Sequence, residues 1–168
     1  AAEVIASYAD RVDLFLTSGG VSVGKKDIMH GVVPALGAER LFWRVCMKPG
    51  APAIAYTRGR MLGIALSGNP FAAYATFELM ARPAMAWLAG ETNVLMPRRR
   101  AVLADAFPKP CHGRRFLRAR MEADGRVSLP DQHASGSLFS AAGCDAFVDV
   151  PAGTPPLAAG TEVEVVIL

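Results

Sequence analysis

The sequence predicts a partial doubly wound α/β layer, truncated at its N-terminus, followed by a small C-terminal β-barrel domain. Residues 1–92 alternate between helical and strand patterns, which is typical of α/β layers. From residue 93 onward, short β-like stretches are separated by turns rich in Pro, Gly and Asp, which is typical of a barrel or sandwich. The truncation is expected because only one helix and one strand precede the first glycine-rich loop, where a complete layer opens with a further βα unit. We therefore expect two domains, at residues 1–92 and 93–168.

The α/β part combines helical periodicity with short apolar runs that predict buried strands. Helices are expected at residues 2–9, 27–36 and 71–88. Strands are expected at residues 14–16, 41–47, 53–56 and 61–66, the last two joined by a hairpin turn at 57–60. Asn69 is a favourable N-cap for the third helix, and Pro70 suits its first position because that position needs no N–H donor.

The β part contains no pattern for a long helix. Its strands are expected at residues 101–104, 116–121, 127–129, 146–150 and 162–167. One or two helical turns are expected at residues 138–142.

Composition excludes several classes of protein. With 52% hydrophobic and 20% charged residues, the chain is too apolar for a disordered protein. Three cysteines are too few for a disulfide scaffold and are typical of a reducing compartment. No apolar run reaches the ~20 residues of a membrane-spanning helix. The N-terminal residues lack the basic segment of a signal peptide, so we expect a cytoplasmic protein without a membrane partner.

The basic residues are unevenly distributed along the chain. Eight of the 18 Lys and Arg residues lie between positions 96 and 120, with Asp105 as the one acid among them. The rest of the chain is net negative. This asymmetry favours a local anionic partner over a general affinity for nucleic acid.

A glycine-rich loop at residues 17–24 directly follows the first expected strand. Glycines let a backbone approach a ligand closely, and successive N–H groups can form a nest that binds an anion at the carboxyl edge of a sheet. A tight structural connection is the alternative. Asp27 follows this loop and is either a ligand of Mg²⁺ beside a phosphate or a residue that complements the dipole of the next helix; spacing alone favours the second.

Two further segments, one strand end and one turn, contain polar groups that suit an anion. Alternation along the expected strand 41–47 places Arg44 and Lys48 on one face, where they either clamp an oxyanion or are simply solvated. The turn Ser67–Pro70 leads from a strand into a helix N-terminus, which is either an anion site or a plain N-cap. Since the glycine-rich loop at residues 17–24 and the turn Ser67–Pro70 both follow strands of one layer, we expect these two to converge on a shared ligand.

The segment 113–120 alternates arginines with Phe116 and Leu117 and is either a cationic surface for RNA or a solvated strand face. The three histidines (His30, His112 and His133) are far apart and not at metal-ligand spacing, so we interpret them as surface or loop residues.

Five ordered blocks carry a resemblance to one family. They read DLFLTSGGVSVGKKD, FWRVCMKPGAP, GIALSGNPFAA, GRRFLRARM and HASGSLFSAAGCDAF. Together they resemble, over nearly the whole chain, the C-terminal half of the molybdopterin molybdenumtransferases, the MoeA and gephyrin E-domain family. The resemblance implies that residues 1–92 are the C-terminal half of a molybdopterin-binding α/β domain and that residues 93–168 are a small all-β C-terminal domain.

The resemblance also implies a reaction in molybdenum cofactor biosynthesis. Family members use Mg²⁺ to cleave adenylylated molybdopterin, release AMP and insert molybdenum from molybdate into the dithiolene. It further implies a homodimer of the full-length protein, with the fragment inactive alone. A second possibility is a gephyrin-like scaffold that binds partner proteins without turnover, and a third is an RNA-binding module that uses residues 98–120.

Site residues carry over by motif position. Asp27, Lys48 and Arg44 match functional positions of the family, Asp27 also as the metal ligand. The residues implied to bind the substrates are Gly19, Gly20, Ser22, Gly24, Ser67, Gly68, Asn69, Pro70, Arg118 and Ser135. Among these, the resemblance assigns Arg118 and Ser135 to molybdate. Ser67 replaces the proline usual at that position of the family's turn, and Lys25–Lys26 stands where acidic residues are common.

Overall fold

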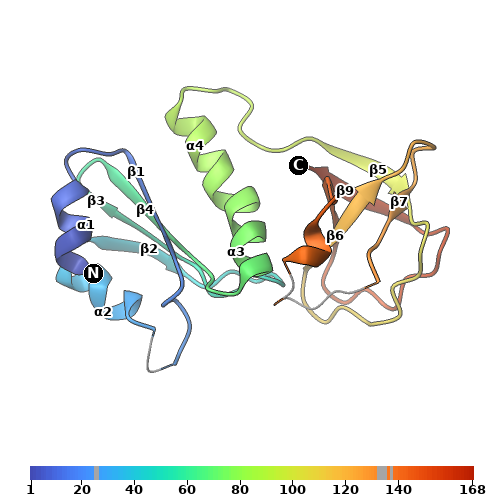
Figure 1. The fold of residues 1–168 in the computed structure, drawn as a ribbon, viewed down its shortest axis with the longest axis horizontal. Helices are drawn as coiled ribbons and strands as arrows, with labels where there is room; N and C mark the ends of the chain where they lie inside the picture. Colours follow the sequence, from blue (N-terminus) through green and yellow to red (C-terminus); the bar gives the residue numbers. More distant parts are fainter. Residues whose placement is uncertain (25–26, 132–135, 137) are drawn as a thin grey trace. The chain divides into compact units, whose positions relative to one another are not determined.

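The computed structural model describes residues 1–24, 27–131, 136 and 138–168. The chain forms two compact units, each with its own sheet (Figure 1). The first unit comprises Ala1–Val45 and Gly50–Val94, and the second comprises Cys46–Pro49 and Leu95–Leu168. A short stretch in the middle of the α/β sequence therefore belongs to the second unit.

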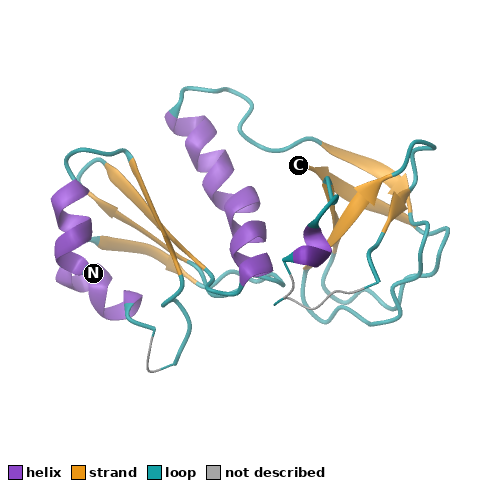
Figure 2. Ribbon diagram, viewed as in Figure 1, coloured by secondary structure: helices purple, strands orange, loops and turns teal. Residues whose placement is uncertain are grey.

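The first unit is a mixed sheet with helices on both faces (Figure 2). Its elements in chain order are α1 (Ala2–Tyr8), β1 (Leu14–Ser18), α2 (Met29–Ala35), β2 (Glu39–Trp43), β3 (Ile54–Arg58), β4 (Met61–Leu66), α3 (Pro70–Thr76), the π-helical segment η1 (Phe77–Ala81) and α4 (Arg82–Leu88). The strand order is β1-β4-β3-β2. β1 and β4 are parallel, whereas β3 is antiparallel to both of its neighbours.

Alternation along β4 divides the core of the first unit into two layers. Met61 and Ala65 pack with the helices α1 and α2, while Ile64 and Leu66 pack with Ala81 of η1 on the opposite face. The expected helix 2–9 is confirmed to within one residue, and so is the hairpin between β3 and β4, whose strands pair up to its two-residue turn.

The expected helix at 71–88 is confirmed in extent but contains a π-helical turn. The backbone N–H of Arg82 donates to the carbonyl of Phe77, five residues earlier. The next residue, Pro83, has no N–H, and its ring would collide with the carbonyl four residues before it in a regular α-helix. The wider turn immediately before Pro83 accommodates this residue without ending the helix.

The second unit is an antiparallel sheet that curls toward closure. Its elements are β5 (Arg98–Val102), β6 (Arg115–Met121), β7 (Val127–Ser128), the 3₁₀ turn η2 (Phe139–Ala141), β8 (Ala146–Val150) and β9 (Glu162–Ile167), in the sheet order β5-β9-β8-β6-β7. Leu103, just after β5, forms a bridge with Val127 of β7, and the Ala104 N–H donates to the Val127 carbonyl at 2.8 Å. The two edges of the sheet therefore meet around a core that includes Leu117, Val148 and Val165, as a small barrel requires.

Two expected strands have different limits in the structure. The strand expected at 101–104 begins at Arg98, because arginines on its outward face pair with acidic residues of neighbouring strands. The strand expected at 41–47 is β2 and ends at Trp43. Arg44 has a positive φ of 68°, which takes the chain out of the strand. No described helix has the length and hydrophobicity needed to cross a lipid bilayer.

Candidate functional site

The two expected anion-binding loops lie side by side at one edge of the first unit's sheet. β1 and β4 are parallel neighbours, so their carboxyl ends meet at the same edge. The Gly19 N–H donates to the Leu66 carbonyl at 2.9 Å, and the Ser18 hydroxyl donates to the Ser67 carbonyl at 3.2 Å. These bonds hold the glycine-rich loop after β1 against the turn after β4.

Glycine is required where the two loops touch. A Cβ at Gly68 would stand 3.1 Å from the Cα of Gly19, closer than most such contacts allow. Gly19 and Gly20 have φ angles of 89° and 71°, which favour glycine. The loops can approach this closely only because both contact points lack side chains, and this leaves their backbones accessible to a ligand.

Asp27 closes the far end of the glycine-rich loop. Its Oδ2 accepts a hydrogen bond from the Gly24 N–H at 2.6 Å, and its own N–H donates to the Gly24 carbonyl at 2.9 Å. Helix α2 begins at Met29 with Ile28 at its N-cap and no side-chain cap bond. Asp27 therefore makes no side-chain cap bond to α2 within the described residues, because this carboxylate bonds backwards to the loop, and its effect on the helix dipole stays a prediction. Lys25 and Lys26 lie outside the described residues.

The middle of the loop is held by two aromatic rings. The ring nitrogen Nε2 of His30 lies 2.8 Å from the Ser22 carbonyl, and the indole N–H of Trp43 donates to the Val21 carbonyl at 3.0 Å. The rings of His30 and Trp43 pack edge to face, with centroids 4.6 Å apart. His30 is thus a partly buried helical residue that supports the loop, and its interpretation as a surface or loop residue is wrong.

The turn after β4 contains the predicted N-cap. The side chain of Asn69 accepts from the Ala72 N–H at 3.4 Å, and Pro70 occupies the start of α3. The Ser67 hydroxyl accepts from the Asn69 N–H, also at 3.4 Å. The N-cap is confirmed, while an additional role in binding an anion stays a prediction.

Arg44 and Lys48 do not share a strand. Arg44 follows β2, its N–H donates to the Ala53 carbonyl at 2.9 Å, and its guanidinium lies over the ring of Trp43. Lys48 belongs to the second unit, where it pairs with the start of β6. The expected strand face carrying both cations is therefore wrong, since the positive φ at Arg44 ends the alternation.

Lys48 bonds to β6 through its backbone. Its N–H donates to the Arg114 carbonyl at 2.9 Å, and its carbonyl accepts from the Phe116 N–H at 2.8 Å. This is a parallel bridge with Arg115, which places the exposed Lys48 on the Arg115 face of the strand. Arg118 belongs to the opposite face of the same strand.

Arg118 is buried, with 1% of its surface exposed. One guanidinium N–H donates to the hydroxyl of Ser140 in η2, and on the neighbouring strand Arg118 pairs with Phe147. Burial lowers the pKa of the Arg118 guanidinium from its usual value, yet an arginine remains charged. A buried charge of this kind is costly unless it is hydrogen-bonded, as Arg118 is to Ser140. Ser135, the other residue expected at molybdate, lies outside the described residues.

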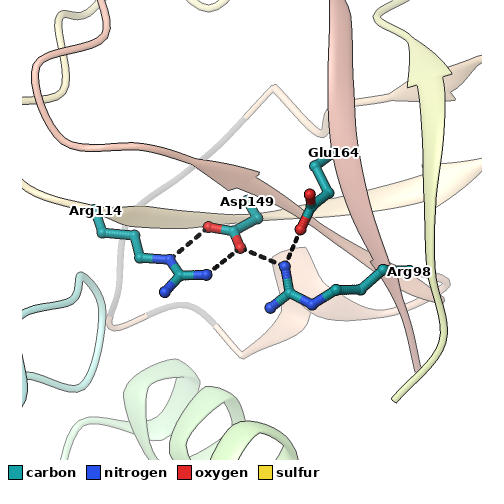
Figure 3. Close-up of polar contacts among 4 residues, drawn as sticks. All are labelled: Arg98, Arg114, Asp149 and Glu164. Carbon is teal, nitrogen blue, oxygen red and sulfur yellow. Dashed lines mark hydrogen bonds and ion pairs between the residues drawn. The ribbon is translucent and has the colours of Figure 1, made fainter. Parts of the chain in front are cut away.

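Arg114, just before β6, and Arg98 of β5 share a carboxylate that the sequence patterns did not single out. Figure 3 shows Asp149 of β8 between Arg114 and Arg98, with Glu164 also bonded to Arg98. Arg114 donates to both carboxylate oxygens at 2.9 and 2.6 Å, and Arg98 donates to Oδ2 at 2.7 Å. Burial alone would raise the pKa of Asp149, but the bonds to the two arginines outweigh it and hold that pKa below its usual value.

Burial and pairing of two arginines weaken the RNA interpretation. Arg118 is buried and Arg114 is paired with Asp149, so neither contributes a solvated, unpaired cation to this strand face. Asp149 is recognisable only in the folded sheet, because its partners are 35 and 51 residues away in sequence.

Among the described residues, no group of three or more His, Cys, Asp or Glu side chains is arranged to hold a metal ion. The one metal ligand expected from the sequence is Asp27. Its Oδ1 makes no hydrogen bond within the described part of the chain. A single carboxylate suits Mg²⁺ only where substrate phosphate and water complete the coordination.

Residues 1–87 match the model of a family described as "Probable molybdopterin binding domain", and residues 100–168 match that of the MoeA C-terminal region, domain IV. The chain belongs to the MoeA family of molybdopterin-binding proteins. This MoeA-family chain is 37% identical over 162 residues to a molybdopterin molybdenumtransferase of Bacillus subtilis, covering 94% of this chain and 37% of that protein. It is 32% identical over 169 residues to a molybdopterin molybdenumtransferase of Staphylococcus aureus, covering 98% of this chain and 40% of that protein.

Solved structures agree on the fold. A molybdopterin biosynthesis MoeA protein from Pyrococcus horikosii aligns with a TM-score of 0.81 at 24% identity, covering 99% of this chain and 40% of that chain. A molybdenum cofactor biosynthesis protein from Pyrococcus furiosus aligns with a TM-score of 0.73 at 25% identity, covering 99% of this chain and 53% of that chain. This MoeA-family chain thus spans less than half the length of the curated relatives it matches. The predicted family and the predicted fold, a partial α/β layer followed by a small β-barrel, are confirmed.

Proposed function

We propose that the full-length protein acts in molybdenum cofactor biosynthesis as a molybdopterin molybdenumtransferase. In this reaction the adenylate bond of adenylylated molybdopterin is cleaved, AMP leaves, and molybdenum from molybdate enters the dithiolene. The observation that supports the proposal is the contact between two glycine loops at one sheet edge, in a chain of the MoeA family. Such an edge suits an anionic nucleotide-like ligand.

In the first unit, the proposed role of the loops is to bind the phosphates of the substrate. Backbone N–H groups of Gly20 and Ser22 would donate to phosphate oxygens, as in other anion-binding nests. Gly19 and Gly24, whose N–H groups bond to Leu66 and Asp27, would shape the loop around the ligand. The turn Ser67-Gly68-Asn69-Pro70 would form the adjacent wall, because it contacts the loop directly. Arg44 would supply a further cation.

Asp27 is the residue we propose to hold Mg²⁺ together with substrate phosphate. The ion would supply charge neutralisation at the phosphates when bound. Its Oδ2 already orders the loop through Gly24, so one carboxylate would both shape the nest and hold the metal.

In the second unit, the proposed role of Lys48 and Arg118 is to bind the molybdate oxyanion. Guanidinium and ammonium groups form strong charge-assisted hydrogen bonds with oxyanions. Ser140 holds the Arg118 guanidinium, which prepares it for a ligand before the ligand arrives. By family resemblance we further propose that Ser135 assists Arg118. We also propose that the domains comprise residues 1–92 and 93–168. The full-length protein is proposed to be a cytoplasmic homodimer, and this fragment to be inactive alone.

The experiment is a molybdate-dependent assay of cofactor formation with the full-length protein. We expect Lys48→Ala and Arg118→Lys to reduce turnover at low molybdate, while Arg100→Ala, at an exposed ion pair, retains it. Circular dichroism spectra identical to wild type would exclude misfolding as the cause. Wild-type molybdate dependence in both variants would contradict these assignments.

The second candidate function is a scaffold that binds partner proteins without turnover. The observation that favours it is the exposure of large apolar side chains on α4, where Trp87 is 68% exposed and Met85 is 45% exposed. Partner capture that survives Gly68→Ala but fails with Trp87→Ser would support it, and the reverse pattern would contradict it.

A further inference from the structure

A second candidate binding site lies in the barrel unit and is lined by none of the residues assigned above. A pocket of about 510 Å³ is formed by the segment 105–109 after β5, Arg115 at the start of β6, and the segment 129–131 after β7. It is lined by both charged and apolar side chains. A volume in this range accommodates a small metabolite.

The walls of this pocket are braced by the backbone. Phe107 exchanges two hydrogen bonds with Leu157, at 2.8 and 2.9 Å. The Oδ2 of Asp105 accepts from the Leu129 N–H at 2.9 Å, which ties the first wall to the third. Pro108 and Pro130 restrict the backbone at the rim. The pocket is thus largely formed before any ligand binds.

Arg115 lines the pocket, and within the described part of the chain it forms no ion pair. Its guanidinium lies 5.0 Å from the ring centroid of the buried Phe107, a distance at which cation and ring attract. Within the described residues, no carboxylate lies within 4.0 Å of it, whereas its neighbour Arg114 is doubly bonded to Asp149. A fixed guanidinium whose donor edge is not neutralised is suited to bind a carboxylate.

The pocket holds charges of both signs that do not neutralise one another. Lys109 and Arg115 line it together with Asp105 and Asp131, yet the described residues contain no ion pair among these four. The carboxylate of Asp105 is held in place by the hydrogen bond that it accepts from the Leu129 N–H. The pocket therefore presents separate positive and negative groups to a ligand.

We propose that this pocket binds a small zwitterion of the α-amino acid class. The carboxylate of the ligand bonds to Arg115, its ammonium group faces Asp105 and Asp131, and its side chain packs on Leu129 and Pro130. A ligand with both charges gains from both groups, whereas a simple anion is repelled by the two carboxylates. The inference is independent of the proposed transferase activity, since it uses none of the same residues.

The test is a titration of the purified protein with three probes of matched shape: phenylalanine, 3-phenylpropanoate without the ammonium group, and phenethylamine without the carboxylate. Amide chemical shifts of Phe107, Arg115 and Leu129 report binding in this pocket. We expect phenylalanine to bind more tightly than either analogue, and Arg115→Gln to weaken it roughly tenfold or more, the effect of a lost charge-assisted hydrogen bond. Arg99→Gln, at an exposed arginine outside the pocket, is the control and should change nothing.

A second variant separates a zwitterion site from a plain anion site. Asp131→Asn removes one negative group at the exposed rim, so it should weaken phenylalanine and strengthen 3-phenylpropanoate. Tighter binding of 3-phenylpropanoate than of phenylalanine by the wild type would overturn the proposal. Equal effects of Arg115→Gln and Arg99→Gln, or unchanged shifts with all three probes, would overturn it as well.

Discussion

Replacing Asp149 with Asn tests whether the ion cluster stabilises the barrel. The Asp149 side chain is 5% exposed and accepts three hydrogen bonds from Arg114 and Arg98. Asn keeps the shape of the side chain, but it loses the negative charge and turns an amide N–H₂ group toward one guanidinium. The two guanidinium groups then lose the negative charge between them, and Glu164 remains as a counter-charge to Arg98.

The structure limits how large the loss of stability can be. A hydrogen bond to a charged group contributes about 1.5–3 kcal/mol. The Arg98 and Arg114 side chains are 39% and 48% exposed, so water replaces part of what they lose and screens their repulsion. We therefore expect Asp149→Asn to lower the free energy of unfolding of the barrel by about 2–3 kcal/mol, below the ~3–5 kcal/mol typical of breaking a fully buried pair.

The assay must report on the second unit alone. Both tryptophans, Trp43 and Trp87, lie in the first unit, so fluorescence does not follow the barrel. Hydrogen exchange of the β6 and β8 amides does, and it should accelerate in Asp149→Asn. Asp124→Asn, at a fully exposed pair with Arg126, is the matched control and should leave exchange unchanged. Equal exchange in wild type and Asp149→Asn, or equal acceleration in both variants, would refute the reasoning.

The same cluster gives the barrel a defined response to acid. Because the pKa of Asp149 in the folded protein lies below its usual value, its contribution to stability is present above that usual value and is lost as the pH falls through the folded pKa. Wild-type stability should therefore fall more steeply with acid below about pH 4 than that of Asp149→Asn, in urea titrations followed by circular dichroism. Parallel acid profiles would contradict this assignment.

Three further predictions concern the first unit. Gly68→Ala forces the two loops apart, since the new Cβ would meet Gly19 at 3.1 Å, and should weaken molybdopterin binding in a direct titration, whereas Gly31→Ala has nothing within 4 Å and should not. Gly63→Ala places a Cβ 2.1 Å from the Tyr56 ring. It should lower the free energy of unfolding, measured by urea titration, by at least about 2 kcal/mol. Tyr56→Phe should leave stability equal or higher in the same titration, because the buried hydroxyl has no hydrogen-bond partner among the described residues.

Much of the fold was predictable because local signals agreed with the tertiary structure. The Asn69–Pro70 helix start, the hairpin between β3 and β4, and the helix at residues 2–9 follow from capping, turn and periodicity rules that depend on neighbours in sequence. The end of β2 was not predictable, because Arg44 adopts a positive φ that no local pattern signals in a residue with a side chain.

The candidate site was predictable to a different degree in each unit. The adjacency of the two glycine loops follows from parallel pairing of the strands that precede them, so sequence order and one topological rule suffice. The burial of Arg118 and the pairing of Asp149 depend on which strands of the barrel become neighbours. Composition alone assigns such residues to the surface, since charged side chains are seldom fully buried.

The pleat of β6 separates Arg118 from Arg115. Arg118 lies on the outward face with Phe116, while Arg115 shares the opposite face with Leu117 and with the bridged Lys48. The amino-acid pocket is lined by neither Lys48 nor Arg118, so the effects must be independent. Arg115→Gln should weaken amino-acid binding without changing molybdate dependence, and Arg118→Lys should do the reverse. The double variant should then show the sum of the two free-energy changes, as expected for sites without shared partners. A change in molybdate dependence caused by Arg115→Gln would mean that both faces of β6 serve a single site.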